Sequence, residues 1–162
     1  MGFMGSGKST VGRLLAHRLA FDFVDTDALV EARAGQTVAN LFRTLGEPAF
    51  RALESRALES LRDQDRVVVA TGGGAPAQQV NRWFFQGSNV FHLRVSLETV
   101  RQRTAGDRDR PLLALEEPAL RALFENRQPV YESLGAGVPT DGREPAEIAE
   151  EIFRKLSLAD GL

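Results

Sequence analysis

Cysteine is absent from the 162 residues of this chain, which excludes disulfide bonds, thiolate metal sites and catalysis by a cysteine nucleophile. Long apolar runs are absent too, because no segment approaches the length that a helix needs to cross a bilayer. No secretory signal is recognised ahead of the first motif. We therefore expect a cytoplasmic protein with no membrane partner. Histidine is scarce, and neither of the two residues has a ligand partner at a spacing typical of a metal site.

Net charge is also small. The 20 basic and 22 acidic residues give a formal net charge of −2. A nucleic-acid partner normally requires a broad basic stripe, which this sequence lacks, so we expect none. The arginines fall instead in separated places, which favours recognition of small anions. The hydrophobic share of 43% is ordinary for a globular protein, and the length suits one domain over 1–162.

Glycine is concentrated at the start of the chain. The segment 2–10 reads GFMGSGKST and contains a complete G-x-x-x-x-G-K-[ST] phosphate-binding loop. Glycine lets the backbone curl so that successive N–H groups point at phosphate oxygens. Lys8 can reach the β- and γ-phosphates, and the Ser9 hydroxyl can ligate Mg²⁺. Apolar residues then recur at helical spacing, so the loop opens a helix whose N-terminus favours anions. The motif predicts binding of a nucleoside triphosphate.

Short apolar runs alternate with amphipathic stretches along the rest of the chain. Strands are expected over 21–24, 67–70, 90–95 and, more weakly, 137–140. Helices are expected over 28–34, 38–45, 48–61, 78–85, 97–104, 118–134 and 146–156. This alternation predicts an α/β fold with a parallel sheet covered on both faces. Ligands of such sheets bind beyond the carboxyl ends of the strands, so the phosphate loop, 25–27 and 72–74 should meet on one rim.

Two motifs between the first and second expected strands carry charged side chains. Asp25 and Asp27 follow the first strand, where one could hold Mg²⁺ through water while the other faces an acceptor hydroxyl. A structural alternative makes either aspartate the N-cap of the next helix, a position that Asp27 could well occupy. Arg51 and Glu54 lie three residues apart on one helix face, which fits either a binding site or a surface ion pair.

Three later motifs suit the recognition of anions. The glycines of 72–74 allow a ligand to approach backbone N–H groups closely, unless a strained turn alone requires them. Arg110 lies in the stretch 104–117, which contains charged residues, Gly and Pro; such a loop can close over phosphates and exclude water. Arg127 offers a guanidinium suited to bidentate binding of a carboxylate.

Taken together, these residues resemble the shikimate kinase family over nearly the whole chain. The motifs occur in the family's order: the phosphate loop, Asp25-x-Asp27, Phe50-Arg51-x-x-Glu54, Gly72-Gly73-Gly74, Arg110-Pro111-Leu112 and Arg127-x-Pro129-x-Tyr131. The loop is shared by many kinases and GTPases, whereas the triple glycine and the carboxylate-binding arginines discriminate this family. The resemblance implies a P-loop kinase fold of strand order 2-3-1-4-5. It also implies transfer of the γ-phosphoryl group of ATP to the 3-hydroxyl of shikimate by a monomeric enzyme of aromatic amino acid biosynthesis.

The resemblance implies a shikimate-binding region over about 26–54 and a lid over about 104–117. Asp27 would orient the 3-hydroxyl and accept its proton, while Arg51 and Arg127 would clamp the carboxylate. The implied shikimate site comprises Asp27, Arg51, Gly73, Gly74 and Arg127. An apolar wall would come from Val38, Phe42 and Phe50, with Glu54 holding Arg51 in place.

The implied ATP site begins in the phosphate loop. The residues that would hold the phosphates are Gly5, Ser6, Gly7, Lys8, Ser9 and Thr10. Mg²⁺ would lie on Ser9 and, through water, on Asp25. Lys8 and Arg110 would stabilise the transferring phosphoryl group, and Arg103 and Arg143 would sandwich the adenine.

Two alternatives stay open at this point: another P-loop small-molecule kinase, acting on gluconate or a nucleoside monophosphate, and a non-catalytic nucleotide-responsive protein on the same fold. Neither kinase alternative accounts for the triple glycine together with Arg51 and Arg127. The family normally has a full hydrophobic strand before the loop, whereas only Met1 precedes Gly2 here. A fragment, an upstream start and a fold that tolerates the loss are all compatible with this. We expect the truncated strand to loosen the domain, and about six to eight added apolar residues to raise its thermal stability and ATP affinity.

Overall fold

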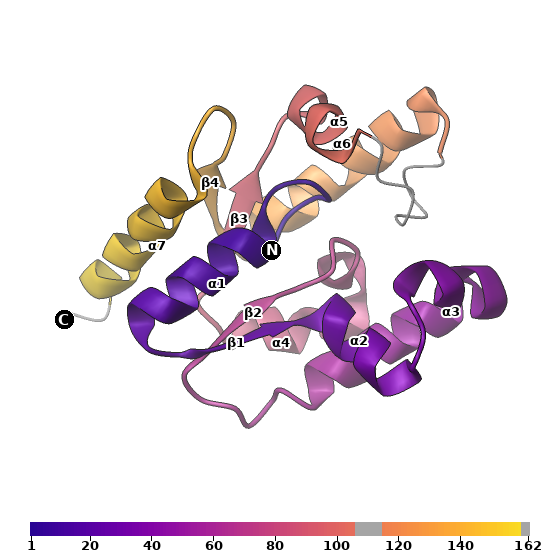
Figure 1. The fold of residues 1–162 in the computed structure, drawn as a ribbon, viewed down its shortest axis with the longest axis horizontal. Helices are drawn as coiled ribbons and strands as arrows, with labels where there is room; N and C mark the ends of the chain where they lie inside the picture. The colour runs from indigo at the N-terminus through magenta and orange to yellow at the C-terminus, as the bar shows by residue number, and fades with distance from the viewer. Residues whose placement is uncertain (106–114, 160–162) are drawn as a thin grey trace.

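The computed structural model describes residues 1–105 and 115–159. Within them the helices are α1 (Lys8–Leu19), α2 (Thr26–Ala34), α3 (Val38–Glu59), α4 (Arg82–Gln86), α5 (Leu97–Thr104), α6 (Glu117–Leu134) and α7 (Pro145–Ala159). The strands are β1 (Asp22–Asp25), β2 (Val67–Ala70), β3 (Phe91–Arg94) and β4 (Ala136–Pro139). Figure 1 shows the strands in the interior with helices around them, which confirms the expected α/β architecture. No helix of these residues combines the length and apolar character needed to cross a membrane.

The strands form two parallel pairs. β1 pairs with β2, and β3 pairs with β4. In the described part of the chain no ladder joins β2 to β3, and a single parallel bridge links Gly2 to Leu93 of β3. In the expected order 2-3-1-4-5, strand 1 is the strand before the phosphate loop. The segment at Met1 and Gly2 takes that place, and β1, β2, β3 and β4 correspond to strands 2, 3, 4 and 5. The sequence of β2, VVVA, is apolar throughout because a parallel sheet is covered on both faces.

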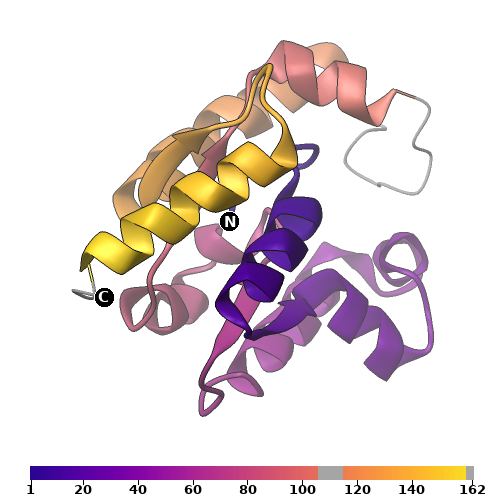
Figure 2. The same ribbon diagram turned by 60° about the vertical axis from the view of Figure 1, so that its left-hand side comes forward.

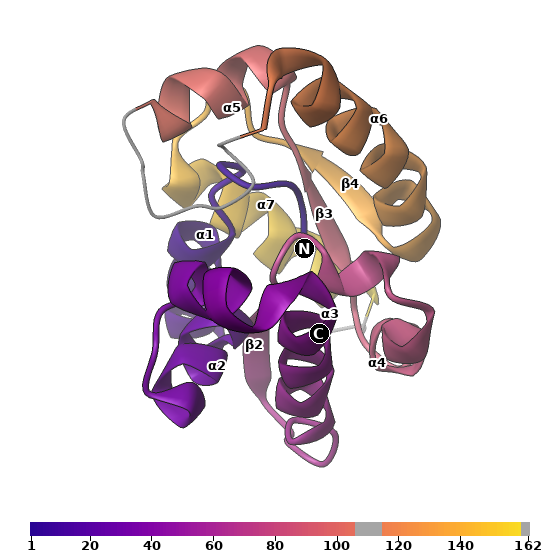
Figure 3. The ribbon, with the colours of Figure 1, turned by 90° about the vertical axis from the view of Figure 1, so that its right-hand side faces the viewer.

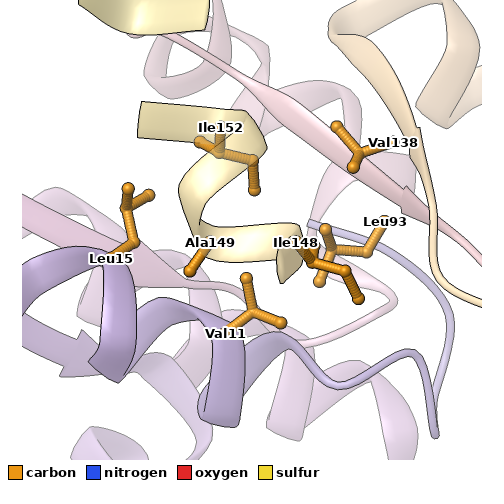
Figure 4. Close-up of a cluster of buried hydrophobic side chains, with 7 residues drawn as sticks. All are labelled: Val11, Leu15, Leu93, Val138, Ile148, Ala149 and Ile152. Carbon is orange, nitrogen blue, oxygen red and sulfur yellow. The ribbon is translucent and has the colours of Figure 1, made fainter. Parts of the chain in front are cut away.

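Helices cover both faces of the strands. α1 and α7 lie together on one face (Figure 2), where apolar residues recurring every three or four positions along α7 meet α1 and the strands. Figure 4 shows the resulting buried cluster of Val11, Leu15, Leu93, Val138, Ile148, Ala149 and Ile152. On the other face α3, α4 and α6 contribute to a second cluster around Leu58, Ala75 and Phe85. These layers fix the carboxyl ends of the strands beside the phosphate loop.

Two expected helices differ in detail from those found. α3 spans both 38–45 and most of 48–61, but Gly46 has a non-helical backbone (φ 77°, ψ 167°) that kinks it between the two segments. The helix expected over 78–85 is replaced by short 3₁₀ helices, η1 (Ala75–Ala77) and η2 (Gln79–Asn81), followed by the short α4. Gln78 is extended there, and the buried Asn81 side chain donates to the Ala75 carbonyl at 3.0 Å. The same carbonyl accepts from the Gln78 N–H at 3.2 Å, so a 3₁₀ turn closes there and the Asn81 side chain adds a second bond to it.

Candidate active site

The phosphate loop has the backbone that its glycines predict. Gly5 and Gly7 adopt left-handed conformations with φ of 73° and 89°, which only glycine adopts at little cost. Gly7 caps α1 without a side-chain acceptor, and the first N–H groups of a helix have no acceptor within the helix itself. Lys8 lies at the same end, and its Nζ donates to the Phe3 carbonyl at 3.0 Å. An anion is the acceptor that fits this positively polarised turn.

A pocket of about 520 Å³ opens next to this loop, at the carboxyl ends of β1 and β2. The expected site residues that line it are Gly5, Gly7, Lys8, Ser9, Thr10, Asp25, Asp27, Arg51, Gly73, Gly74 and Arg127. Val38, Phe42 and Phe50 supply its apolar wall, as expected. Ser6 is buried within the loop and does not line the pocket. The expected convergence of distant motifs on one rim is therefore present.

Asp25 and Asp27 have different roles at the start of α2. Asp25 is the helix N-cap, since its Oδ1 accepts from the Asp27 N–H at 3.0 Å. The cap role that the sequence left open for either aspartate thus belongs to Asp25, and the Asp27 side chain faces the pocket. Burial raises the pKa of Asp27, and the Asp25 charge adds to the rise, against the opposing charges of Lys8 and Arg51. Asp27 is consequently a more basic carboxylate than an exposed one.

The other oxygen of Asp25 lies beside the phosphate loop. Its Oδ2 accepts from the Ser9 hydroxyl at 2.5 Å. A hydroxyl and a carboxylate are hard oxygen donors of the kind Mg²⁺ prefers, so these residues fit the expected metal. Among the described residues no cluster of three His, Cys, Asp or Glu side chains forms a cage for a metal.

Arg51 and Glu54 form a buried pair on α3. Arg51 Nη1 donates to Glu54 Oε2 at 2.9 Å, and Arg51 Nη2 donates to Glu47 Oε1 at 2.9 Å. Glu54 is fully buried and Arg51 is 9% exposed, so the surface-ion-pair alternative is wrong. Burial favours a lower pKa of Arg51, but the charge of Glu54 and the hydrogen bonds outweigh it and raise the pKa. The guanidinium is thus charged and held in one orientation at the pocket wall.

Two members of the triple glycine, Gly72 and Gly74, are required by side chains of the site. None of these glycines has a positive φ, so a strained turn is not the reason for them. A methyl group on Gly72 would lie 2.7 Å from Asp27 Oδ1, and one on Gly74 would collide with the Arg51 guanidinium. A methyl group on Gly73 would be in ordinary contact with Arg127 Nη1 at 3.5 Å, and its nearest neighbour would be the Gly2 carbonyl oxygen at 3.2 Å. Gly72 and Gly74 therefore let the Asp27 carboxylate and the Arg51 guanidinium pack directly against the backbone of this segment.

Tyr131 completes this arrangement and was given no role by the sequence analysis. It lies one turn after Arg127 on α6, is fully buried, and donates from its hydroxyl to the Gly73 carbonyl at 2.5 Å. Burial raises the pKa of Tyr131 to about 12, which keeps the hydroxyl protonated as a donor. Burial lowers the pKa of Arg127, although the neighbouring Tyr131 opposes that effect. The spacing of four residues between Arg127 and Tyr131 was the available signal.

Thr26 was also missed, and no sequence signal pointed to it. Its side chain is fully buried, and its hydroxyl accepts from the Gly72 N–H at 2.9 Å. This contact joins the start of α2 to the glycine segment, so it fixes the position of Asp27 relative to Gly73.

The other residues that the sequence predicted for the site either lie outside this pocket or fall outside the residues that the structure describes. Arg103 donates to the carbonyl of Gly5 at 3.2 Å and of Thr140 at 3.0 Å, which places it against the phosphate loop. Arg143 donates to the Pro139 carbonyl at 3.0 Å and pairs with Glu151 at 2.8 Å. Both guanidiniums therefore lie near the carboxyl end of β4. Arg110 and most of the expected lid over 104–117 fall outside the described residues.

Comparison with known proteins agrees with this geometry. Residues 4–157 match the family described as shikimate kinase. The chain belongs to the shikimate kinase family. A shikimate kinase of Persephonella marina is 41% identical over 157 residues, covering 96% of both chains. One of Moorella thermoacetica is 44% identical over 158 residues, covering 96% of this chain and 91% of that one. Shikimate kinases are ATP-dependent phosphotransferases that act on a hydroxyl group.

Solved shikimate kinases share the fold. The structure from Acinetobacter baumannii, in complex with shikimate, superposes with a TM-score of 0.93 at 38% identity, covering 99% of this chain and 92% of that chain. The Aquifex aeolicus structure superposes with a TM-score of 0.86 at 34% identity, covering 98% and 95%. The P-loop kinase fold expected from the sequence is thus confirmed.

Proposed function

We propose that this protein phosphorylates shikimate, transferring the γ-phosphoryl group of ATP to the 3-hydroxyl. The observation that carries this proposal is the pair of buried guanidiniums, Arg51 from α3 and Arg127 from α6, in one pocket with Asp27 and the phosphate loop. Two arginines suit a carboxylate, and a basic carboxylate suits a hydroxyl nucleophile. An acceptor that carries both groups matches the pocket, and the related A. baumannii enzyme was solved with shikimate.

The chemistry follows from positioning and charge. Phosphoryl transfer has a loose transition state, so the protein mainly aligns reactants and stabilises charge on the phosphoryl oxygens. Arg51 and Arg127 fix the carboxylate end of the acceptor, which directs its hydroxyl to Asp27. Asp27 orients this hydroxyl and takes its proton. Lys8 stabilises the developing negative charge from the loop side. Mg²⁺ held by Ser9 and, through water, by Asp25 would supply further neutralisation of the phosphates.

The other roles implied by the family complete the proposal. Arg110 would contact the transferring phosphoryl group from a lid over about 104–117, which excludes water when it closes. Arg103 and Arg143 would flank the adenine, and the contact of Arg103 with Gly5 supports a position beside the nucleotide. A single domain over 1–162, a shikimate-binding region over about 26–54, a monomeric state and a cytoplasmic location stay predictions.

A coupled assay of ADP release tests the proposal directly. The purified chain is supplied with ATP, Mg²⁺ and one of three acceptors: shikimate, gluconate or AMP. We expect rapid ADP release when shikimate is the acceptor and not with gluconate or AMP. The Asp27→Asn variant should lose this ADP release. Preference for gluconate or AMP would assign the site to another small-molecule kinase. ATP binding without ADP release for any acceptor would identify a nucleotide-responsive protein instead.

A further inference from the structure

A second carboxylate reaches Arg51 from its own helix. Glu47 lies one turn before Arg51 on α3, and its Oε1 accepts from Arg51 Nη2 at 2.9 Å and from Arg51 Nε at 3.2 Å. The buried Glu54 accepts from the other terminal nitrogen, Nη1, at 2.9 Å. Arg51 therefore contacts two carboxylates of its own chain.

These two carboxylates differ in their freedom to move. Glu54 is fully buried, whereas 54% of the Glu47 side chain is exposed. Glu47 also lies between Gly46, where α3 changes direction (Figure 3), and Pro48, which has no N–H to continue the helical ladder. Because solvent and a break in the helix adjoin it, the Glu47 side chain is free to turn away from Arg51, while Glu54 stays in place.

The bond geometry shows that Glu47 pairs with Arg51 incompletely. The edge formed by Nε and Nη2 of a guanidinium is a fork that suits the two oxygens of one carboxylate. In the structure both nitrogens donate to a single oxygen, Oε1 of Glu47. A carboxylate that offers one oxygen to each nitrogen makes two parallel bonds, which is a stronger pairing. Glu47 is thus a partner of Arg51 that a better placed carboxylate can replace.

Charge explains why a replaceable partner lies there. Arg51 and Arg127 are 9% and 7% exposed, and a buried cation is costly without a counter-charge. Burial favours a lower pKa of both guanidiniums, and the charge of Glu47 is among those that oppose this effect on each of them. Glu47 therefore serves as a counter-charge for both arginines. The carboxylate of an acceptor would bring the same charge to the same place.

We infer that Glu47 is an internal placeholder for the carboxylate of the acceptor. It occupies the Nε and Nη2 fork of Arg51 in the free enzyme, and it is displaced when the acceptor's carboxylate binds there. The inference rests on the proposed function, since it takes Arg51 to bind the acceptor through a carboxylate. Its consequence is a compromise, in which Glu47 stabilises the free enzyme and weakens the binding of the acceptor.

The test compares Glu47→Gln and Glu47→Asp with the unmodified chain. Glutamine keeps the size of the side chain but removes its charge, whereas aspartate keeps the charge but is one methylene shorter and should no longer reach Arg51. Calorimetric titration with shikimate measures the Kd, and thermal unfolding of the free protein measures stability. We expect each variant to lower the Kd for shikimate by about threefold, the scale of a half-exposed ion pair. The thermal midpoint should fall by about 2 °C.

Kinetics and a matched control separate this exchange from a general structural effect. In Glu47→Gln the KM for shikimate should fall by about threefold, with kcat and the KM for ATP unchanged. The control is Glu59→Gln, which removes the exposed partner of Arg62 on the same helix. Neither residue of that pair lines the substrate pocket, so the control should change neither the Kd nor the KM for shikimate.

Each outcome decides the inference. Tighter binding of shikimate in both variants, together with lower stability, supports it. Weaker binding in Glu47→Gln would make Glu47 a support that fixes Arg51 for the acceptor, and an unchanged Kd in both variants would give it no part in binding; either result overturns the inference.

Two further results would also overturn it. Tighter binding in Glu47→Gln with an unchanged Kd in Glu47→Asp would point to charge repulsion without a displaced contact. Failure of the unmodified chain to bind shikimate would overturn the proposed function and the inference with it, which distinguishes that case from the others.

Discussion

Asp27 has a raised pKa, mainly because it is buried and secondly because Asp25 is near. Replacement by asparagine keeps the shape but removes the proton acceptor. We expect Asp27→Asn to lower kcat by roughly 10²-fold or more, with little change in the KM for ATP. Steady-state kinetics with both substrates measures this, and Asp22→Asn at the exposed start of β1 is the control. A kcat near that of the unmodified enzyme would remove Asp27 from the reaction.

Arg51 and Arg127 are expected to act through their planar forks rather than through charge alone. Lysine keeps the charge but loses the bidentate geometry. Arg127→Lys and Arg51→Lys should each raise the KM for shikimate and leave the KM for ATP nearly unchanged. Arg121→Lys, on the exposed side of α6, is the matched control. The reverse pattern, with the KM for ATP rising instead, would mean that the arginines serve the nucleotide.

At the scale of elements, the turn after β2 holds the site together by close packing. Alanine at Gly74 would place a methyl group against the Arg51 guanidinium, which the pair with Glu54 holds in place. We expect Gly74→Ala to raise the KM for shikimate by about tenfold or more, because a small displacement of a positioning group is costly. Gly142→Ala has open space around it but a φ of 66°, so it should lower stability without changing this KM. Unchanged kinetics in Gly74→Ala would show that Arg51 moves freely.

The segment between α5 and α6 is proposed to be the lid that carries Arg110. Arg110→Ala should mainly reduce kcat, because a lid contact matters most as charge builds on the transferring phosphoryl group. Amide exchange across 104–117 should slow when nucleotide and shikimate are both bound. Rapid exchange there in the ternary complex would argue against a lid.

For the whole molecule, two buried bases link stability to pH. Burial lowers the pKa of His92 to about 4 and that of the Met1 amino group to about 5. The unfolded chain keeps ordinary pKa values, 6.5 and 8.0, and so binds more protons than the folded chain between pH of about 4 and 8. The contribution of these groups to the free energy of unfolding therefore rises with pH across this window and is lost as the pH falls.

A variant isolates the histidine part of this effect. His92→Phe removes the titrating ring and also a buried Nδ1 that has no partner among the described residues. We expect the variant to lose less stability than the unmodified chain between pH 7 and pH 5, measured by urea unfolding. The matched control is a replacement of the exposed histidine on α1, His17→Gln. An equal slope in His92→Phe would show that His92 is not the sensor.

The sequence alone determined the phosphate loop, the alternation of strands and helices, and the family. These follow from patterns read within a few residues, such as glycine spacing before Lys8 and the apolar run of β2. It also predicted that the motifs meet on one rim, because the carboxyl ends of parallel strands share an edge. Boundaries near Gly46 and Asn81 were less well predicted, since a kink and a side-chain hydrogen bond decided them.

Only the tertiary structure decided how the site is built. The burial of the Arg51–Glu54 pair, the need for glycine at 72 and 74, and the bond from Tyr131 to Gly73 all depend on packing between segments far apart in the chain. Local patterns set which helices and strands form, whereas long-range packing sets which side chains touch. The chemistry of this site depends on the long-range packing.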